Sequence, residues 1–151
     1  MKRALDHDDR NFPHREVTGQ IIAAALKVHS ALGPGLLESA YQICLADEMS
    51  RRGLNFEREA QLPVVFEGCR LDCSHRLDFV VEAHVIVEVK CVEALVAIHE
   101  AQLLTYLRLA QKDVGLLLNF NEVHLRDGIV RRANTKLIPS SAPSAFSASL
   151  R

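Results

Sequence analysis

Two apolar runs separated by three residues constrain the fold of this 151-residue chain more than any other feature. The first run, 77–81, reads Leu-Asp-Phe-Val-Val, and the second, 85–90, reads Val-Ile-Val-Glu-Val-Lys. Short runs this rich in β-branched residues are typical of strands inside a sheet, yet these two carry Asp78, Glu88 and Lys90. An isolated buried carboxylate is costly unless it is protonated, paired or bound to a metal. The pattern therefore indicates a functional site.

The two runs also predict how their strands pair. Side chains alternate between the faces of a strand, so the apolar residues 77, 79 and 81 are expected on one face and Asp78 on the other. A three-residue loop, 82–84, aligns the apolar faces and sets Asp78 opposite Glu88. Like charges in this position repel, and a divalent cation would relieve the repulsion. A solvated edge hairpin, on which Lys90 pairs with one acid, stays open as an alternative.

Composition sets limits on partners and location. Lys and Arg total 18 against 19 Asp and Glu, and the net charge of −1 provides no general attraction to nucleic acid or to an anionic membrane. The N-terminus lacks the apolar segment of a secretory signal, and no run is long enough to span a bilayer, so we expect a cytoplasmic protein. Cysteines in that reducing compartment are expected as thiols, and their spacing does not favour a metal site: Cys44, Cys69, Cys73 and Cys91.

The chain is expected to form one domain, 16–138, between an N-terminal arm, 1–15, and a flexible tail rich in Ser, Ala and Pro, 139–151. Helical periodicity and strand composition predict an α/β fold with a mixed central β-sheet flanked by helices. The expected helices are 17–32, 36–52 and 94–111, and the expected strands are 54–56, 62–66, a run from 70, 76–81, 85–91, 114–119 and 128–132.

Three short motifs resemble those of a known enzyme superfamily. Asp78 followed by Glu88-Val89-Lys90 is similar to the signature of the PD-(D/E)XK nucleases, with Leu77 in place of the proline. Residues 35–41, Gly-Leu-Leu-Glu-Ser-Ala-Tyr, resemble the motif of the GxxExxY proteins, a branch of that superfamily. Residues 102–106, Gln-Leu-Leu-Thr-Tyr, resemble the QxxxY helix of its exonuclease-like members. The resemblance runs from 17 to 121 and implies a restriction-endonuclease-like core with an N-terminal helical hairpin.

The resemblance also implies a set of site residues. Glu38, Asp78 and Glu88 would bind the metal together with the carbonyl of Val89, and oxygen ligands of this kind suit Mg²⁺ or Mn²⁺. The catalytic residues would be Asp78, Glu88, Lys90, Gln102 and Glu38.

Four further residues are expected near the substrate: Tyr106, Tyr41, Arg76 and His99. Tyr106 has an alternative role as an ordinary core residue whose hydroxyl reaches the rim of the core. His99 has an alternative role at the start of a helix. Two basic clusters are candidates for phosphate contact or are simply solvated faces: Arg51, Arg52 and Arg58, and Arg126, Arg131, Arg132 and Lys136.

The function expected from these features is metal-dependent hydrolysis of phosphodiester bonds in nucleic acid, with DNA favoured over RNA. The alternative is a non-catalytic module of the same fold that binds nucleic acid or assembles with other proteins. The weak overall charge favours a partner protein that supplies substrate recognition, and assembly into a homo-oligomer stays open.

Overall fold

The computed structural model describes residues 12–135, and of residues 72–74 only the backbone. The predicted arm and tail therefore lie almost wholly outside the described residues. Three helices, one short 3₁₀ helix and five strands follow in this order: α1 (Arg15–Leu32), α2 (Glu38–Arg51), β1 (Phe56–Phe66), β2 (Cys69–Val81), β3 (Val85–Lys90), α3 (Ala97–Ala110), β4 (Val114–Asn119), η2 (Leu125–Gly128) and β5 (Ile129–Ala133).

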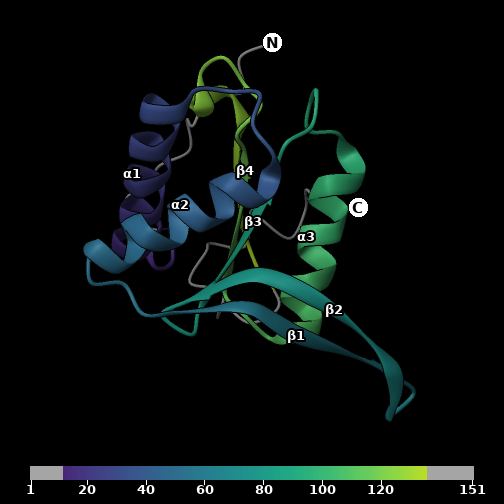
Figure 1. Ribbon diagram of the computed structural model, residues 1–151. Helices are drawn as coiled ribbons and strands as arrows, with labels where there is room; N and C mark the ends of the chain where they lie inside the picture. The colour runs from purple at the N-terminus through teal and green to yellow at the C-terminus, as the bar shows by residue number, and fades with distance from the viewer. Residues whose placement is uncertain (1–11, 136–151) are drawn as a thin grey trace, which may run out of the picture.

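The five strands form one sheet in sequence order, from β1 at one edge to β5 at the other. Every neighbouring pair is antiparallel except β3 and β4, which are parallel and are connected through α3. Helices α1 and α2 cover one face of the sheet and α3 covers the other (Figure 1). The expected mixed sheet flanked by helices is confirmed.

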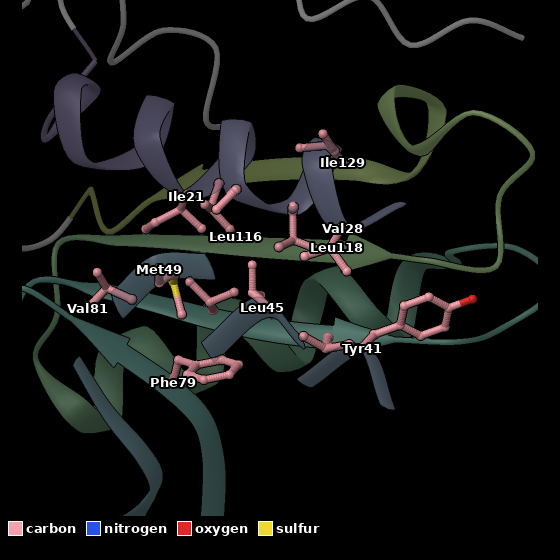
Figure 2. Packing of buried hydrophobic residues seen from close by; sticks show 14 of the residues in the cluster. Ile21, Val28, Tyr41, Leu45, Met49, Phe79, Val81, Leu116, Leu118 and Ile129 are labelled. Carbon is pink, nitrogen blue, oxygen red and sulfur yellow. The ribbon is translucent and has the colours of Figure 1, made fainter. Parts of the chain in front are cut away.

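Two hydrophobic clusters hold these layers together. The larger one packs α1 and α2 against the sheet, with Tyr41, Leu45 and Met49 of α2 facing Phe79 of β2 (Figure 2). The smaller one packs Leu103 and other residues of α3 against the opposite face. Because β3 and β4 are covered on both faces, nearly all their residues are buried, as is usual for parallel strands.

The predicted register of the central hairpin is confirmed. Phe79 pairs with Val87, and Val81 pairs with Val85 across the three-residue loop 82–84. Within this loop, Glu82 and Ala83 have positive φ. Positive φ at two successive residues is also typical of type I′ hairpin turns, whose twist matches that of the flanking strands.

The prediction of a shared apolar face holds only in part. Phe79 and Val81 belong to the cluster under α1 and α2, whereas Leu77 belongs to the cluster under α3. The pairing of β2 with β3 ends at Phe79, so the strand is free to turn at Asp78 and to present its earlier residues to the other layer.

The two short strands predicted at 54–56 and 62–66 are one continuous strand, β1, which pairs with β2 along almost its whole length. Together they form a long ribbon that extends away from the rest of the sheet (Figure 1). The break between the two predicted pieces is wrong, because β1 is an edge strand on which the charged side chains 57–59 stay exposed.

No helix within residues 12–135 has the length and apolar character needed to cross a membrane. The described cysteines, Cys44, Cys69 and Cys91, are free thiols.

Candidate active site

The two acids of the central hairpin are bonded crosswise where β2 and β3 separate. The backbone N–H of Asp78 donates to Oε1 of Glu88 over 3.2 Å, and the backbone N–H of Val89 donates to Oδ2 of Asp78 over 2.8 Å. The two side chains thus accept backbone N–H groups at the point where the backbone pairing of β2 with β3 ends. We call Asp78 and Glu88 the acidic pair.

Burial and mutual repulsion make the acidic pair hard to ionise. The pKa of Glu88 is raised from 4.5 to about 8, first because the carboxyl group is buried and next because Asp78 lies beside it. The pKa of Asp78 is also raised by burial, although the N–H of Val89 and the Lys90 ammonium oppose the rise. Positive charge placed at this position would relieve both effects.

Glu38 approaches the acidic pair from α2. It occupies the first turn of that helix, where the helix dipole favours a carboxylate. Partial desolvation raises its pKa, and so does the charge of Asp78, while Lys90 and a hydrogen bond from the backbone N–H of Cys91 lower it. The three acids therefore share one electrostatic environment.

The carboxylate of Glu38 nevertheless lies too far from those of Asp78 and Glu88 for all three to bind one metal ion in this conformation. Among residues 12–135, the one group of three metal-ligating side chains whose ligand atoms all lie within 4.8 Å of one another is His14, His84 and Asp113. The Glu38 side chain is exposed and bonds to Cys91, so the structure brings Asp78 and Glu88 together and leaves Glu38 at the rim.

The backbone of β3 directs the Val89 carbonyl toward the acidic pair. Within a strand, the N–H and C=O of one residue point to the same side. The Val89 N–H bonds to Asp78, whereas the carbonyl of Lys90 accepts from the N–H of Phe120 on the β4 side. The carbonyl of Val89 is therefore on the side of Asp78.

Helix α3 brings Tyr106 and Gln102 to the same region. The pKa of Tyr106 is raised by burial and then by the charges of Glu88 and Asp78, and a hydrogen bond with the Gln102 side chain lowers it. The ring of His75 on β2 lies 5.8 Å from that of Tyr106. Tyr106 therefore lies close enough to the acidic pair for the charges to affect its pKa, and Gln102, four positions earlier on α3, is bonded to it.

Two of the residues expected near the substrate have structural contacts instead. Tyr41 is fully buried and stacks on Phe120, and its hydroxyl donates to the carbonyl of Gly33 and accepts from the N–H of Leu36. The prediction for Tyr41 is therefore corrected: this tyrosine fastens the loop between α1 and α2. The sequence correctly puts Tyr41 on α2, one turn after Glu38. It does not show that this side of the helix packs against the sheet and buries the ring.

His99 also has a local partner, because its Nδ1 accepts from the N–H of Val96 at the start of α3. This contact corresponds to the helix-start role that the sequence left open. Arg76 is exposed on β2, two residues from Asp78, and its place near the substrate stays a prediction.

Sequence reasoning missed Gln42. Its Nε2 lies 3.5 Å from Oε1 of Glu38, and its side chain also hydrogen-bonds to the carboxylate of Asp78. Gln42 therefore connects the acid on α2 to the acidic pair on the sheet. Its place one turn after Glu38 was the available signal, but the packing of α2 against the sheet decides which carboxylate it reaches.

Four arginines of the two basic clusters make intramolecular contacts. Arg132 pairs with Glu100 at 2.6 Å, and Arg131 lies over the ring of Phe12 at 4.4 Å. Arg51 and Arg52 pair with acids on their own helix at 2.9 and 3.2 Å. Burial also lowers the pKa of Arg131. These contacts reduce the positive charge that the clusters offer to a polyanion.

The donors around the acidic pair fit a hard divalent cation. Carboxylates and a backbone carbonyl are oxygen ligands of the type that Mg²⁺ and Mn²⁺ prefer, and a cation bound here would oppose the rise in pKa that burial causes in both carboxyl groups.

Comparison with known families agrees with this geometry. A family model described as the PD-(D/E)XK nuclease superfamily matches residues 15–132, which include all the described helices and nearly all of the described sheet. No curated protein and no solved structure matches the chain.

Proposed function

Because this chain belongs to the PD-(D/E)XK nuclease superfamily, we propose that it is a metal-dependent nuclease of the GxxExxY branch that hydrolyses phosphodiester bonds in DNA in preference to RNA. The observation that carries the proposal is the crosswise-bonded acidic pair, in which Glu88 has a pKa of about 8. Such a pair is unfavourable for folding, and it becomes favourable when a cation is bound.

Each residue of the site has a chemical role in this proposal. Asp78, Glu88 and the Val89 carbonyl would hold Mg²⁺ or Mn²⁺, and the exposed Glu38 would turn inward to complete the ligands. A metal held there would lower the pKa of the attacking water and would neutralise charge on the phosphoryl oxygens. Lys90 lies on the same strand face as Glu88, where its ammonium stabilises that charge.

The residues of α3 position the substrate. Gln102 holds the hydroxyl of Tyr106 beside the acidic pair, and that hydroxyl donates to the substrate backbone. Arg76, exposed on β2, contacts a flanking phosphate.

The proposal is tested with the single variants Asp78→Asn and Glu88→Gln and with the double variant. We expect Mg²⁺-dependent cleavage of plasmid DNA to fall below detection in the double variant, while circular dichroism shows an intact fold. Glu57→Gln removes the charge of an exposed glutamate on β1 and serves as the matched control with unchanged cleavage. Cleavage by the purified double variant at the rate of the natural chain would contradict the proposal.

A non-catalytic module of the same fold is the second candidate, and the paired arginines and the net charge of −1 favour it. A module of this kind would depend on a partner protein or on a second copy of itself to hold nucleic acid. Calorimetric titration with Mn²⁺ separates the two candidates. Binding that disappears in the Asp78→Asn and Glu88→Gln variants supports the nuclease, and the absence of such binding supports the module.

A further inference from the structure

A cluster of two histidines and one aspartate lies away from the acidic pair. Nε2 of His14 is 2.7 Å from Oδ2 of Asp113, and Nδ1 of His84 is 3.2 Å from the same oxygen. The three ligand atoms all lie within 4.8 Å of one another. In tetrahedral zinc sites with bonds of about 2.0–2.1 Å, neighbouring ligand atoms are about 3.3 Å apart, so the separations of 2.7 and 3.2 Å lie below but near the value for such a site.

We propose that His14, His84 and Asp113 form a second metal site, which binds Zn²⁺ or a chemically similar transition metal. Two imidazole nitrogens and one carboxylate oxygen are donors that Zn²⁺ prefers, whereas the oxygen ligands of the acidic pair suit Mg²⁺. His84 precedes β3 and Glu88 lies four residues later, which corresponds to about 13 Å along the strand. The two sites are therefore separate, and this inference does not depend on the proposed nuclease activity.

The backbone holds two of the three residues in fixed positions. The carbonyl of His84 accepts from the N–H groups of Asp113 and Val114 at 3.2 and 3.3 Å, and the carbonyl of Asp113 accepts from the N–H of Asn134 at 2.7 Å. The Asn134 side chain is also bonded to neighbouring carbonyls. These bonds join the segments that lead into β3 and β4, so the ligand positions do not depend on a free loop.

His14 adopts an unfavourable backbone conformation at the start of α1. Its φ of 54° and ψ of 35° are left-handed, a conformation that is unfavourable for residues other than glycine. Such a conformation persists where other contacts compensate for it. Here the compensation is the bond from the His14 side chain to Asp113, which ties the first helix to the sheet.

Metal binding requires one movement. The rings of His14 and His84 are stacked, with centroids 4.4 Å apart and 15° between their planes. A metal lies close to the plane of each imidazole that binds it, so two parallel rings cannot share one ion. Because the side chain of His84 is 54% exposed, its ring has room to leave the stack and to direct Nδ1 at the ion while His14 and Asp113 stay in place.

The test is calorimetric titration of the full chain with ZnCl₂ in buffer containing saturating Mg²⁺, which occupies the oxygen ligands of the acidic pair. We expect one Zn²⁺ per chain, and a loss of affinity of at least about 100-fold in His14→Asn and in His84→Asn. His124→Asn removes an exposed histidine outside the cluster and should bind as the natural chain does. Equal affinity of the natural chain and His84→Asn would overturn the proposal.

X-ray absorption at the zinc edge identifies the ligands independently. We expect two imidazoles and no sulfur. A sulfur ligand would instead place the ion at a cysteine such as Cys91 beside Glu38 and would also overturn the proposal. Because His84 is exposed, its variant should keep the fold, and an unchanged circular dichroism spectrum separates lost ligation from unfolding. Cleavage of DNA is not part of either readout, so failure here leaves the proposed function untouched.

Discussion

At the scale of single residues, Glu88 makes stability depend on pH. Its pKa of about 8 in the folded chain exceeds the ordinary 4.5, so between these pH values the folded state binds more protons than the unfolded state. The free energy of unfolding therefore falls as pH rises through this range. In EDTA, we expect urea denaturation to show a loss on the order of 2–4 kcal/mol from pH 5 to pH 8 relative to Glu88→Gln.

Addition of Mg²⁺ provides the control for this pH dependence. The metal binds the ionised pair, so saturating Mg²⁺ should restore the stability of the natural chain at pH 8 and leave Glu88→Gln almost unaffected. Parallel pH profiles of the two proteins in EDTA would show that Glu88 titrates normally.

Gln42 is the second residue for which we predict a measurable effect on activity. It contacts both Glu38 and Asp78, so we expect Gln42→Ala to misplace the two carboxylates and to lower kcat/KM by about 10–100-fold. Metal affinity should fall with it, while Tm changes little because the side chain is only half-buried. Ile43→Ala, an exposed position next to it on α2, is the matched control. If both variants had similar activity, Gln42 would have no role in positioning the two carboxylates.

At the scale of elements, the packing of α3 on β4 depends on Gly115. A Cβ at this position would lie 2.6 Å from Cδ1 of Leu103, which is buried and has little room to move. We expect Gly115→Ala to lower the free energy of unfolding by about 1–3 kcal/mol. Gly19→Ala, on α1 with no atom within 4 Å of the added carbon, should raise it by about 0.5–1 kcal/mol.

Denaturation in urea measures both glycine variants under the same conditions. A stabilising Gly115→Ala would mean that α3 shifts on the sheet to accept the methyl group. In that case the distance between Tyr106 and the acidic pair would also change, because Leu103 and Tyr106 lie one turn apart on α3.

At the scale of the whole molecule, charge determines how nucleic acid is bound. The net charge is −1, and arginines of both basic clusters are paired with acids or packed on an aromatic ring. We therefore expect few phosphate contacts by the chain alone, with a slope of log affinity against log salt no steeper than about −3.

Fluorescence anisotropy with labelled duplex DNA checks this expectation. The Asp78→Asn, Glu88→Gln double variant prevents cleavage during the titration. A slope near −6 would indicate that the clusters release their internal partners on binding and that the chain recognises nucleic acid without a partner protein.

Local information in the chain was sufficient for much of the fold and for the inner part of the site. Strand β4 was predicted at its observed bounds, since a short apolar run between polar residues has few other structures available. The hairpin register, and with it the contact between Asp78 and Glu88, follows from the period of two along a strand. Glu38 and Gln102 are predicted as site residues only from short motifs that resemble those of the superfamily.

Only the tertiary structure decided the rest. The continuity of β1, the burial of Tyr41 and the reach of Gln42 depend on which layer each element packs against. The cluster of His14, His84 and Asp113 unites residues up to 99 positions apart, with no shared motif. Sequence periodicity shows which residues share a face of one helix or strand. Contacts between elements arise only when the complete chain packs, and for this reason the sequence alone did not determine them.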